Sequence, residues 1–110
     1  MQYKKLKESD LPRCKACLDI IGPGVVWFGE EVPSGALNRA IYAAKESEVF
    51  FSIGTSAIVQ PAASLPLTAK KTGAVLVEIN LEETPISQYC DYVFKEKASK
   101  ILSEITMRLL

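Results

Sequence analysis

Apolar runs that favour β-strands alternate with helical patterns along most of this chain, and that alternation limits the folds open to it. Three runs stand at 48–53 ("EVFFSI"), 74–79 ("AVLVEI") and 91–95 ("DYVFK"), and a short candidate strand at 25–28 precedes them. Helical patterns cover about 35–47, 61–72 and 98–110. Such an order predicts parallel strands joined by right-handed crossovers. We therefore predict an α/β fold with a three-stranded parallel sheet and flanking helices, about half of a Rossmann-like doubly wound domain.

Local signals refine the expected elements. Ser34 is a candidate N-cap for the first helix. Gly73 is placed to end the second helix, while Pro66 predicts a kink or a late start in it. The runs at 48–53 and 74–79 are continuous enough to predict strands buried on both faces.

Composition narrows the function classes. At 110 residues the chain suits one domain, in which we expect a polar arm and loop over 1–24 and a nucleotide-binding part over 25–110. Thirteen basic and thirteen acidic residues cancel, which argues against nucleic acid or a membrane surface as partner. No run is long enough to span a bilayer and the N-terminus lacks a signal-peptide pattern, so we expect a cytoplasmic protein.

Three short segments follow the expected strands at the end of the sheet where open α/β folds bind ligands. They are Gly54-Thr55-Ser56, Asn80-Leu81-Glu82 and 95–98. A glycine, two hydroxyls and an amide suit sugar hydroxyls and an adenine-like ring better than a metal ion. Strand ends are also polar simply because loops are, and the phosphate-binding G-x-G-x-x-G is absent.

Cys14 and Cys17 form a C-x-x-C pair in a loop. This spacing suits half of a tetrahedral zinc site, which needs four ligands, and no second pair exists in the sequence. A redox dithiol and two ordinary free thiols are the alternatives. The chain contains no histidine, the commonest general base.

Five stretches in this order resemble the C-terminal half of the sirtuins, the NAD-dependent protein deacylases. They are "LPRCKAC" (11–17), "GPGVVWFGEEVP" (22–33), "FFSIGTSAIVQPAASLPLTAK" (50–70), "VEINLEETPIS" (77–87) and "KASKIL" (97–102). The similarity covers nearly the whole chain from about Leu11.

The resemblance implies a role for each matching position. Three segments would contact the adenosine side of NAD: Gly54, Thr55 and Ser56; Asn80, Leu81 and Glu82; and Ala98. Cys14 and Cys17 would be the second cysteine pair of a structural zinc site. The acylated peptide would pair along Val25, Val26, Trp27, Phe28, Gly29 and Glu30, by addition of a strand.

Other family features have no match in this chain. These are the N-terminal glycine-rich NAD loop, the Q-N-x-D segment, the catalytic histidine and the first zinc cysteine pair; Leu18 also replaces the usual glycine after the second cysteine. A missing general base typically costs about 10²–10⁴-fold in rate. We therefore assign no catalytic residue and expect a truncated sirtuin-like chain that is inactive alone. It would need an N-terminal sirtuin half as partner, or act as a non-catalytic nucleotide-binding or self-associating module, with a homodimer as one form.

Overall fold

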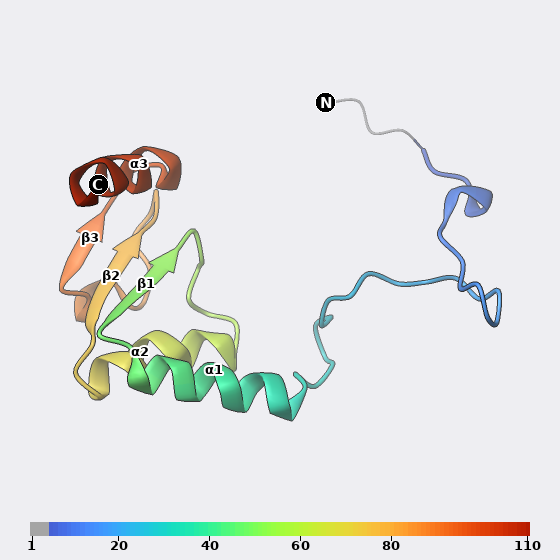
Figure 1. The fold of residues 1–110 in the computed structure, drawn as a ribbon, viewed down its shortest axis with the longest axis horizontal. Coiled ribbons are helices and arrows are strands. Elements are labelled where there is room, and N and C mark those ends of the chain that lie inside the picture. The colour runs from blue at the N-terminus through green and yellow to red at the C-terminus, as the bar shows by residue number, and fades with distance from the viewer. Residues whose placement is uncertain (1–4) are drawn as a thin grey trace. The chain divides into compact units, whose positions relative to one another are not determined.

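The computed structural model describes residues 5–110, which divide into two compact units (Figure 1). One unit ends at Glu31, and the other covers Val32–Leu110. The sequence instead placed the start of the nucleotide-binding part at Val25, a functional division that stays a prediction. None of the described helices combines the length and apolar character needed to cross a membrane.

The larger unit contains a parallel three-stranded sheet, which confirms the predicted α/β fold class. The strands β1 (Val49–Ile53), β2 (Val75–Ile79) and β3 (Tyr92–Phe94) lie in the order β1-β2-β3. Both strand pairs are parallel, with Ser52 opposite Glu78 and Ile79 opposite Phe94. Three helices complete the unit: α1 (Ser34–Glu46), α2 (Leu65–Lys71) and α3 (Ala98–Leu109).

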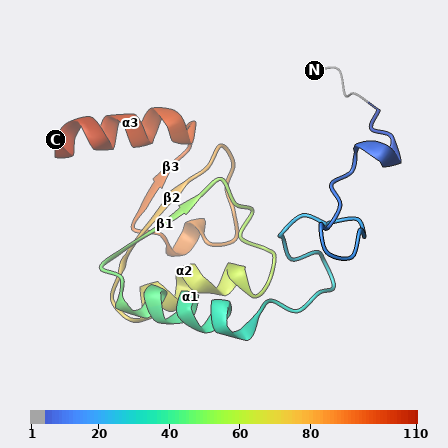
Figure 2. The same ribbon diagram turned by 45° about the vertical axis from the view of Figure 1, so that its right-hand side comes forward.

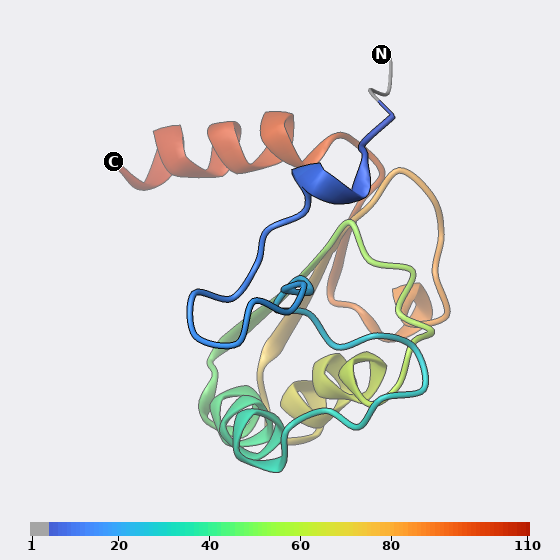
Figure 3. The same cartoon turned by 90° about the vertical axis from the view of Figure 1, so that its right-hand side faces the viewer.

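The helices occupy different sides of this unit. Helix α2 packs against β1 and β2, and α1 lies beside α2 (Figures 2 and 3). Helix α3 runs across the end of the sheet to which the strands point (Figure 1). A small core lies under α1 and α2, where Ala44, Ala69 and Ala74 are buried and the partly buried Phe50 and Leu65 pack against them. The small side chains allow these elements to approach closely.

The start of α2 follows from the position of Pro66. A short 3-10 turn occupies Ala62–Ser64, and α2 begins only at Leu65 with Pro66 in its first turn. Proline is tolerated there because the first N–H groups of a helix have no partner within the helix. Gly73, at a φ of +103°, closes the far end by donating to the Lys70 carbonyl oxygen. The predicted late start and glycine end are both confirmed.

The first helix does not use the predicted cap. Pro33 occupies the N-cap position, Ser34 is already helical, and no side chain caps the helix. Because the proline ring fixes φ, the backbone enters the helix without help from the Ser34 hydroxyl.

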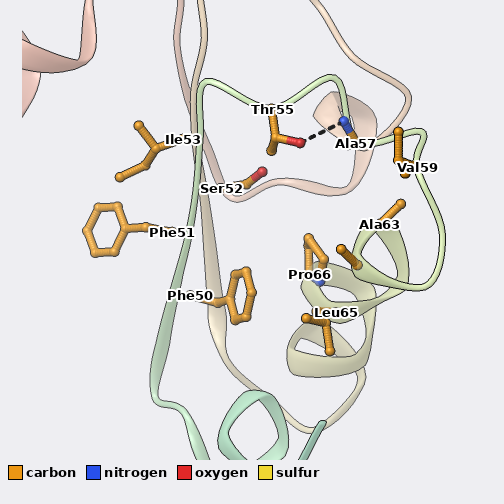
Figure 4. A pocket seen from close by; sticks show the side chains of 11 residues that line it. Phe50, Phe51, Ser52, Ile53, Thr55, Ala57, Val59, Ala63, Leu65 and Pro66 are labelled. Carbon is orange, nitrogen blue, oxygen red and sulfur yellow. Dashed lines mark hydrogen bonds between the residues drawn. The ribbon is translucent and has the colours of Figure 1, made fainter. Parts of the chain in front are cut away.

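Strand β1 is buried on one face only, which corrects the prediction of burial on both faces. Phe50 and Ser52 point toward α2, whereas Phe51 and Ile53 point to the opposite side (Figure 4). Val49, Phe51 and Ile53 retain 40–48% of their surface exposed. Their face is apolar, and the rest of the Val32–Leu110 unit leaves it exposed. By contrast, β2 is central in the sheet and buries Leu76 to Ile79.

The apolar run at 25–28 does not form a strand, so that prediction was wrong. A turn occupies this position, in which the Glu30 amide donates to the Trp27 carbonyl oxygen at 3.0 Å. The Trp27 amide in turn donates to the Glu30 carboxylate at 3.2 Å. A strand needs a neighbour to accept and donate its backbone hydrogen bonds, and within the described residues this segment has none.

Candidate functional site

The loops that follow β1 and β2 meet at the carboxyl end of the sheet, as the parallel topology predicts. The Gly54 amide donates to the Ile79 carbonyl oxygen at 2.9 Å, which extends the β1–β2 ladder by one bond. The Asn80 side-chain amide donates to the Thr55 carbonyl oxygen at 2.8 Å. The structure therefore brings together two of the three segments selected from the sequence.

A pocket of about 280 Å³ opens between these two loops. Its lining comes from both of them: Gly54, Ser56, Ile58, Asn80, Glu82, Glu83, Thr84 and Pro85. The hydroxyl and carboxylate groups offer hydrogen bonds, and the apolar side chains of Ile58 and Pro85 offer surface for a flat ring. Such a mixture suits a nucleoside, in which a hydroxyl-bearing sugar is joined to a flat base.

Gly54 is required by the backbone at this pocket. Its φ of +63° lies in the left-handed region, which residues with a Cβ rarely adopt. A Cβ built there would meet nothing within 4 Å. The glycine therefore serves the sharp exit from β1 and leaves open space beside the backbone for a ligand.

Asn80 joins the two loops as well as lining the pocket. While its Nδ2 binds the Thr55 carbonyl oxygen, its Oδ1 accepts from the Glu82 amide at 3.4 Å. An asparagine amide has two donor hydrogens and two acceptor lone pairs. One donor and one acceptor position thus remain for a ligand hydroxyl.

The third predicted segment is joined to the loop after β2 by one ion pair, outside the second predicted segment. Lys95, just after β3, lies 3.5 Å from the Glu83 carboxylate. Ala98 begins α3, is half-buried, and does not line the pocket. Leu81 is also outside the lining and is largely exposed. Thr55 contributes its carbonyl oxygen to Asn80, and its hydroxyl accepts from the Ala57 amide at 3.2 Å.

The charge of the lining decides which part of a dinucleotide the pocket fits. Glu82 and Glu83 place carboxylates there, and carboxylates accept hydrogen bonds from sugar hydroxyls but repel phosphate. The residues therefore fit the ribose and base of NAD. They do not fit its pyrophosphate, for which the sequence also lacks a glycine-rich loop.

Sequence reasoning missed four of the lining residues: Ile58, Glu83, Thr84 and Pro85. The rule that ligands bind at the carboxyl ends of the strands selected only the first residues after each strand. The loop after β2, however, folds back along the pocket. One signal was available, because Glu78 stands inside the apolar run "AVLVEI". A buried carboxylate must find hydrogen-bond donors nearby.

A second pocket, of about 210 Å³, lies between β1 and α2 (Figure 4). Its lining is mostly apolar and includes Phe50, Leu65 and Pro66. The Ser52 hydroxyl is buried there and has no hydrogen-bond partner among the described residues. Nothing in the sequence pattern indicated this pocket.

The cysteine pair lies in the smaller unit, in a tight turn. Cys14 donates its amide to Asp19 O at 2.8 Å and accepts from Leu18 N at 2.9 Å. Leu18 has a φ of +64°, a conformation in which glycine is unstrained. This explains why a glycine is the expected residue after the second cysteine.

The electrostatics distinguish the thiols. Hydrogen bonds from the backbone of Cys17, then of Ala16, lower the pKa of Cys14, which favours the thiolate form that binds metals. Burial, followed by the charge of Glu78, raises the pKa of Cys90 to about 11. Among the described residues no group of three or more histidine, cysteine or acidic side chains could hold a metal ion. The role of Cys14 and Cys17 as zinc ligands therefore stays a prediction.

The segment selected for peptide binding also belongs to the smaller unit. Val25, Val26, Trp27 and Phe28 are all exposed, the last at 90% of its surface. Gly29 has a φ of +88° and, with Glu30, completes the turn.

Comparison with known proteins identifies the chain's relatives. The model of the Sir2 family matches residues 1–61. An NAD-dependent protein deacylase of Aquifex aeolicus is 50% identical over 94 residues, which cover 86% of this chain and 39% of that protein. An NAD-dependent protein deacetylase of Pyrobaculum aerophilum is 46% identical over 105 residues, covering 96% of this chain and 41% of that protein. The chain thus spans about two fifths of the length of these relatives.

Solved structures agree with the sequence comparison. A Sir2 homologue in complex with ADP-ribose matches with a TM-score of 0.84 and 43% identity, covering 94% of this chain and 41% of that one. A Sir2 protein with a p53 peptide and NAD⁺ matches with a TM-score of 0.80 and 33% identity, covering 92% of this chain and 42% of that one. The parallel sheet, the flanking helices and more than half of the sequence all match the same group, and this chain belongs to the Sir2 family.

Proposed function

We propose that this chain supplies the adenosine side of the NAD site of an NAD-dependent protein-lysine deacylase. The observation that carries the proposal is the polar pocket between the loops after β1 and β2, closed by the 2.8 Å bond from Asn80 to Thr55. Ser56, Glu82 and the free positions of Asn80 would hold the ribose hydroxyls. Relatives named as NAD-dependent deacylases and a homologue bound to ADP-ribose support this assignment.

The segment 25–30 would bind the acylated-lysine protein substrate. Its side chains are exposed, and its backbone pairs with no strand among the described residues. An extended peptide could therefore add to it through main-chain hydrogen bonds. A Sir2 protein in complex with a peptide and NAD⁺ supports this role.

Catalysis would require a second segment of polypeptide. The chain has no histidine to act as general base, and its described residues provide neither a pyrophosphate site nor the second pair of zinc ligands. We propose that an N-terminal sirtuin half supplies all three, and that Cys14 and Cys17 hold zinc only when it does. NAD, when bound to such an assembly, supplies the ribose that accepts the acyl group.

A second candidate is a non-catalytic module that binds nucleotides or associates with itself. It is favoured by β1, which lies at an edge of the described sheet, pairs only with β2, and exposes Val49, Phe51 and Ile53 on one face. Exposed edges of this kind pair readily with other chains. A homodimer through β1 is the form we propose for this module.

Calorimetric titration of the 110-residue chain with ADP-ribose, with NAD in parallel, tests the proposed site. We expect ADP-ribose to bind and Asn80→Ala to abolish binding, because that change removes both a ligand contact and the link between the loops. Asn38→Ala, an exposed asparagine on α1, is the matched control and should bind as the unchanged chain does. Absence of heat at millimolar ADP-ribose would contradict the proposal and favour the second candidate.

A further inference from the structure

Glu78 is a fully buried carboxylate in the central strand of the sheet. It lies in β2, two residues before Asn80, and 0% of its surface is exposed. No basic side chain among the described residues forms an ion pair with it, because the ion pairs found there all involve other acids. Burial of a carboxylate without a basic partner is costly unless strong hydrogen-bond donors replace the water.

The donors to Glu78 both come from the loop that forms one wall of the candidate pocket. The Thr84 hydroxyl donates to Oε2, and the Ser87 hydroxyl donates to Oε1. These two hydroxyls also accept backbone amides: Ser87 Oγ accepts from Thr84 N at 2.9 Å, and Thr84 Oγ1 accepts from Ile86 N at 3.4 Å. Because each hydroxyl accepts from an amide, its own hydrogen is free to point to Glu78.

This network fixes the loop at the point where it turns. The Ser87 amide donates to the Thr84 carbonyl oxygen at 3.1 Å. Ile86, which lies between Thr84 and Ser87 in the sequence, has only 3% of its surface exposed. Thr84 and Pro85 line the pocket, whereas Glu78 and Ser87 do not. Glu78 thus reaches the pocket only through the residues that it holds.

We propose that Glu78 is a positioning residue, which holds residues 82–87 in the shape that completes the nucleoside pocket. The inference rests on the proposed function for the identity of the ligand, but not for the ordering of the loop. A carboxylate in the rigid centre of the sheet anchors a loop that would otherwise have to order itself when ligand binds. Ordering before binding raises apparent affinity, because only the ordered fraction of molecules is competent to bind.

Two substitutions at Glu78 separate positioning from packing. Glu78→Met keeps a similar volume but cannot accept either hydroxyl, and loss of the buried charge need not lower stability. Glu78→Gln keeps one acceptor oxygen and should restore part of the effect. Ser103→Ala, an exposed hydroxyl on α3, is the control.

The first readout is amide hydrogen exchange of the ligand-free chain. In Glu78→Met we expect exchange at Thr84 and Ile86 to accelerate at least about tenfold, because the acceptors of these amides lose their anchor. The amides of Gly54 and Val75, which bind Ile79 O and Glu48 O, should be unchanged. Unchanged exchange at Thr84 and Ile86 would overturn the proposal. If Glu78→Met fails to fold, Glu78→Gln, which keeps one acceptor oxygen, should give a smaller acceleration at the same two amides.

The second readout is ADP-ribose affinity by calorimetry. We expect about a fivefold or greater weakening in Glu78→Met and partial recovery in Glu78→Gln. Equal affinity of Glu78→Met and the unchanged chain would overturn positioning while the proposed function stands. Failure of the unchanged chain to bind ADP-ribose would instead refute the proposed ligand, and the exchange data alone would then decide whether Glu78 orders the loop.

Discussion

Ser52 and Gly54, one at each pocket, affect the stability of the fold in different ways. Among the described residues, Ser52 Oγ is the buried side-chain polar atom that lacks a hydrogen-bond partner, although Ser52 lies directly opposite Glu78 in the sheet. Gly54, two residues later, has a left-handed backbone that leaves its side open. The unsatisfied hydroxyl of Ser52 lowers the stability of the fold. Gly54 can adopt its left-handed backbone because it has no side chain.

Ser52→Ala should raise the free energy of unfolding by about 1 kcal/mol, since an unsatisfied buried hydroxyl costs roughly 1–3 kcal/mol and alanine removes it. Urea denaturation of the two chains measures the difference. Ser103→Ala, at an exposed site, should change stability by less than about 0.5 kcal/mol. A clear loss of stability in Ser52→Ala would mean that the hydroxyl has a partner after all.

Gly54→Ala should lower the free energy of unfolding by about 1 kcal/mol, because a left-handed backbone costs a residue with a Cβ roughly 1–2 kcal/mol. Nothing lies close enough to clash with the new methyl group, so strain is the whole effect. Gly35→Ala is the comparison, since Gly35 lies in α1 without a positive φ. There alanine should be neutral or stabilising. Thermal or urea unfolding of both variants would reveal effects of opposite sign.

At the scale of elements, a single acid joins α2, β2 and the start of β3. Asp91 lies 2.5 Å from the Lys70 ammonium on α2, and its other oxygen accepts from the Leu76 amide of β2 at 2.8 Å. The hydrogen bond from Lys70, followed by that from Leu76, holds the pKa of Asp91 below its ordinary value of 3.8. The contact ties the layer of helices to the sheet near the base of β3.

The link through Asp91 should make stability depend on acid. A carboxylate whose pKa is lowered by folding contributes fully above its unfolded value and loses that contribution as pH falls toward the folded value. The unfolding free energy of the unchanged chain should therefore exceed that of Asp91→Asn at pH 6, and the gap should narrow below about pH 4. Lys70→Met removes only the hydrogen bond from Lys70, the larger cause of the lowered pKa. Its free energy of unfolding at pH 6 should therefore lie between those of the unchanged chain and Asp91→Asn. A gap that stays constant down to pH 2 would contradict this role.

At the scale of the whole molecule, the sheet has an edge and a face that the rest of its own unit, Val32–Leu110, leaves exposed. Strand β1 has a neighbour on one side only, and Val49, Phe51 and Ile53 expose 40–48% of their surface. The relatives are more than twice as long as the matched segment. An exposed apolar edge in so small a sheet favours association with another chain.

Phe51→Lys should therefore reduce self-association of the chain. Lysine on an edge strand opposes pairing, and the exposed position of Phe51 permits the change without loss of the core. Sedimentation velocity over a range of concentrations measures the oligomeric state. Tyr42→Lys places the same charge on α1, where the side chain is 68% exposed, and should leave the oligomeric state unchanged. If the unchanged chain is monomeric throughout, the proposed homodimer is wrong.

The sequence by itself determined the order of the elements, the parallel sheet and the two loops that meet at its end. Those features depend on local periodicity, on Pro66 and Gly73, and on the rule that parallel strands end on one side. The predictions of a strand at 25–28 and of burial on both faces of β1 were wrong. An apolar run does not show whether another element pairs with it or covers it. Only the tertiary structure decided that Glu78 reaches Thr84 and Ser87 across a returning loop, and that Asn80 spans two loops. Such contacts depend on where the chain turns back in space, and residue type and spacing do not encode this locally.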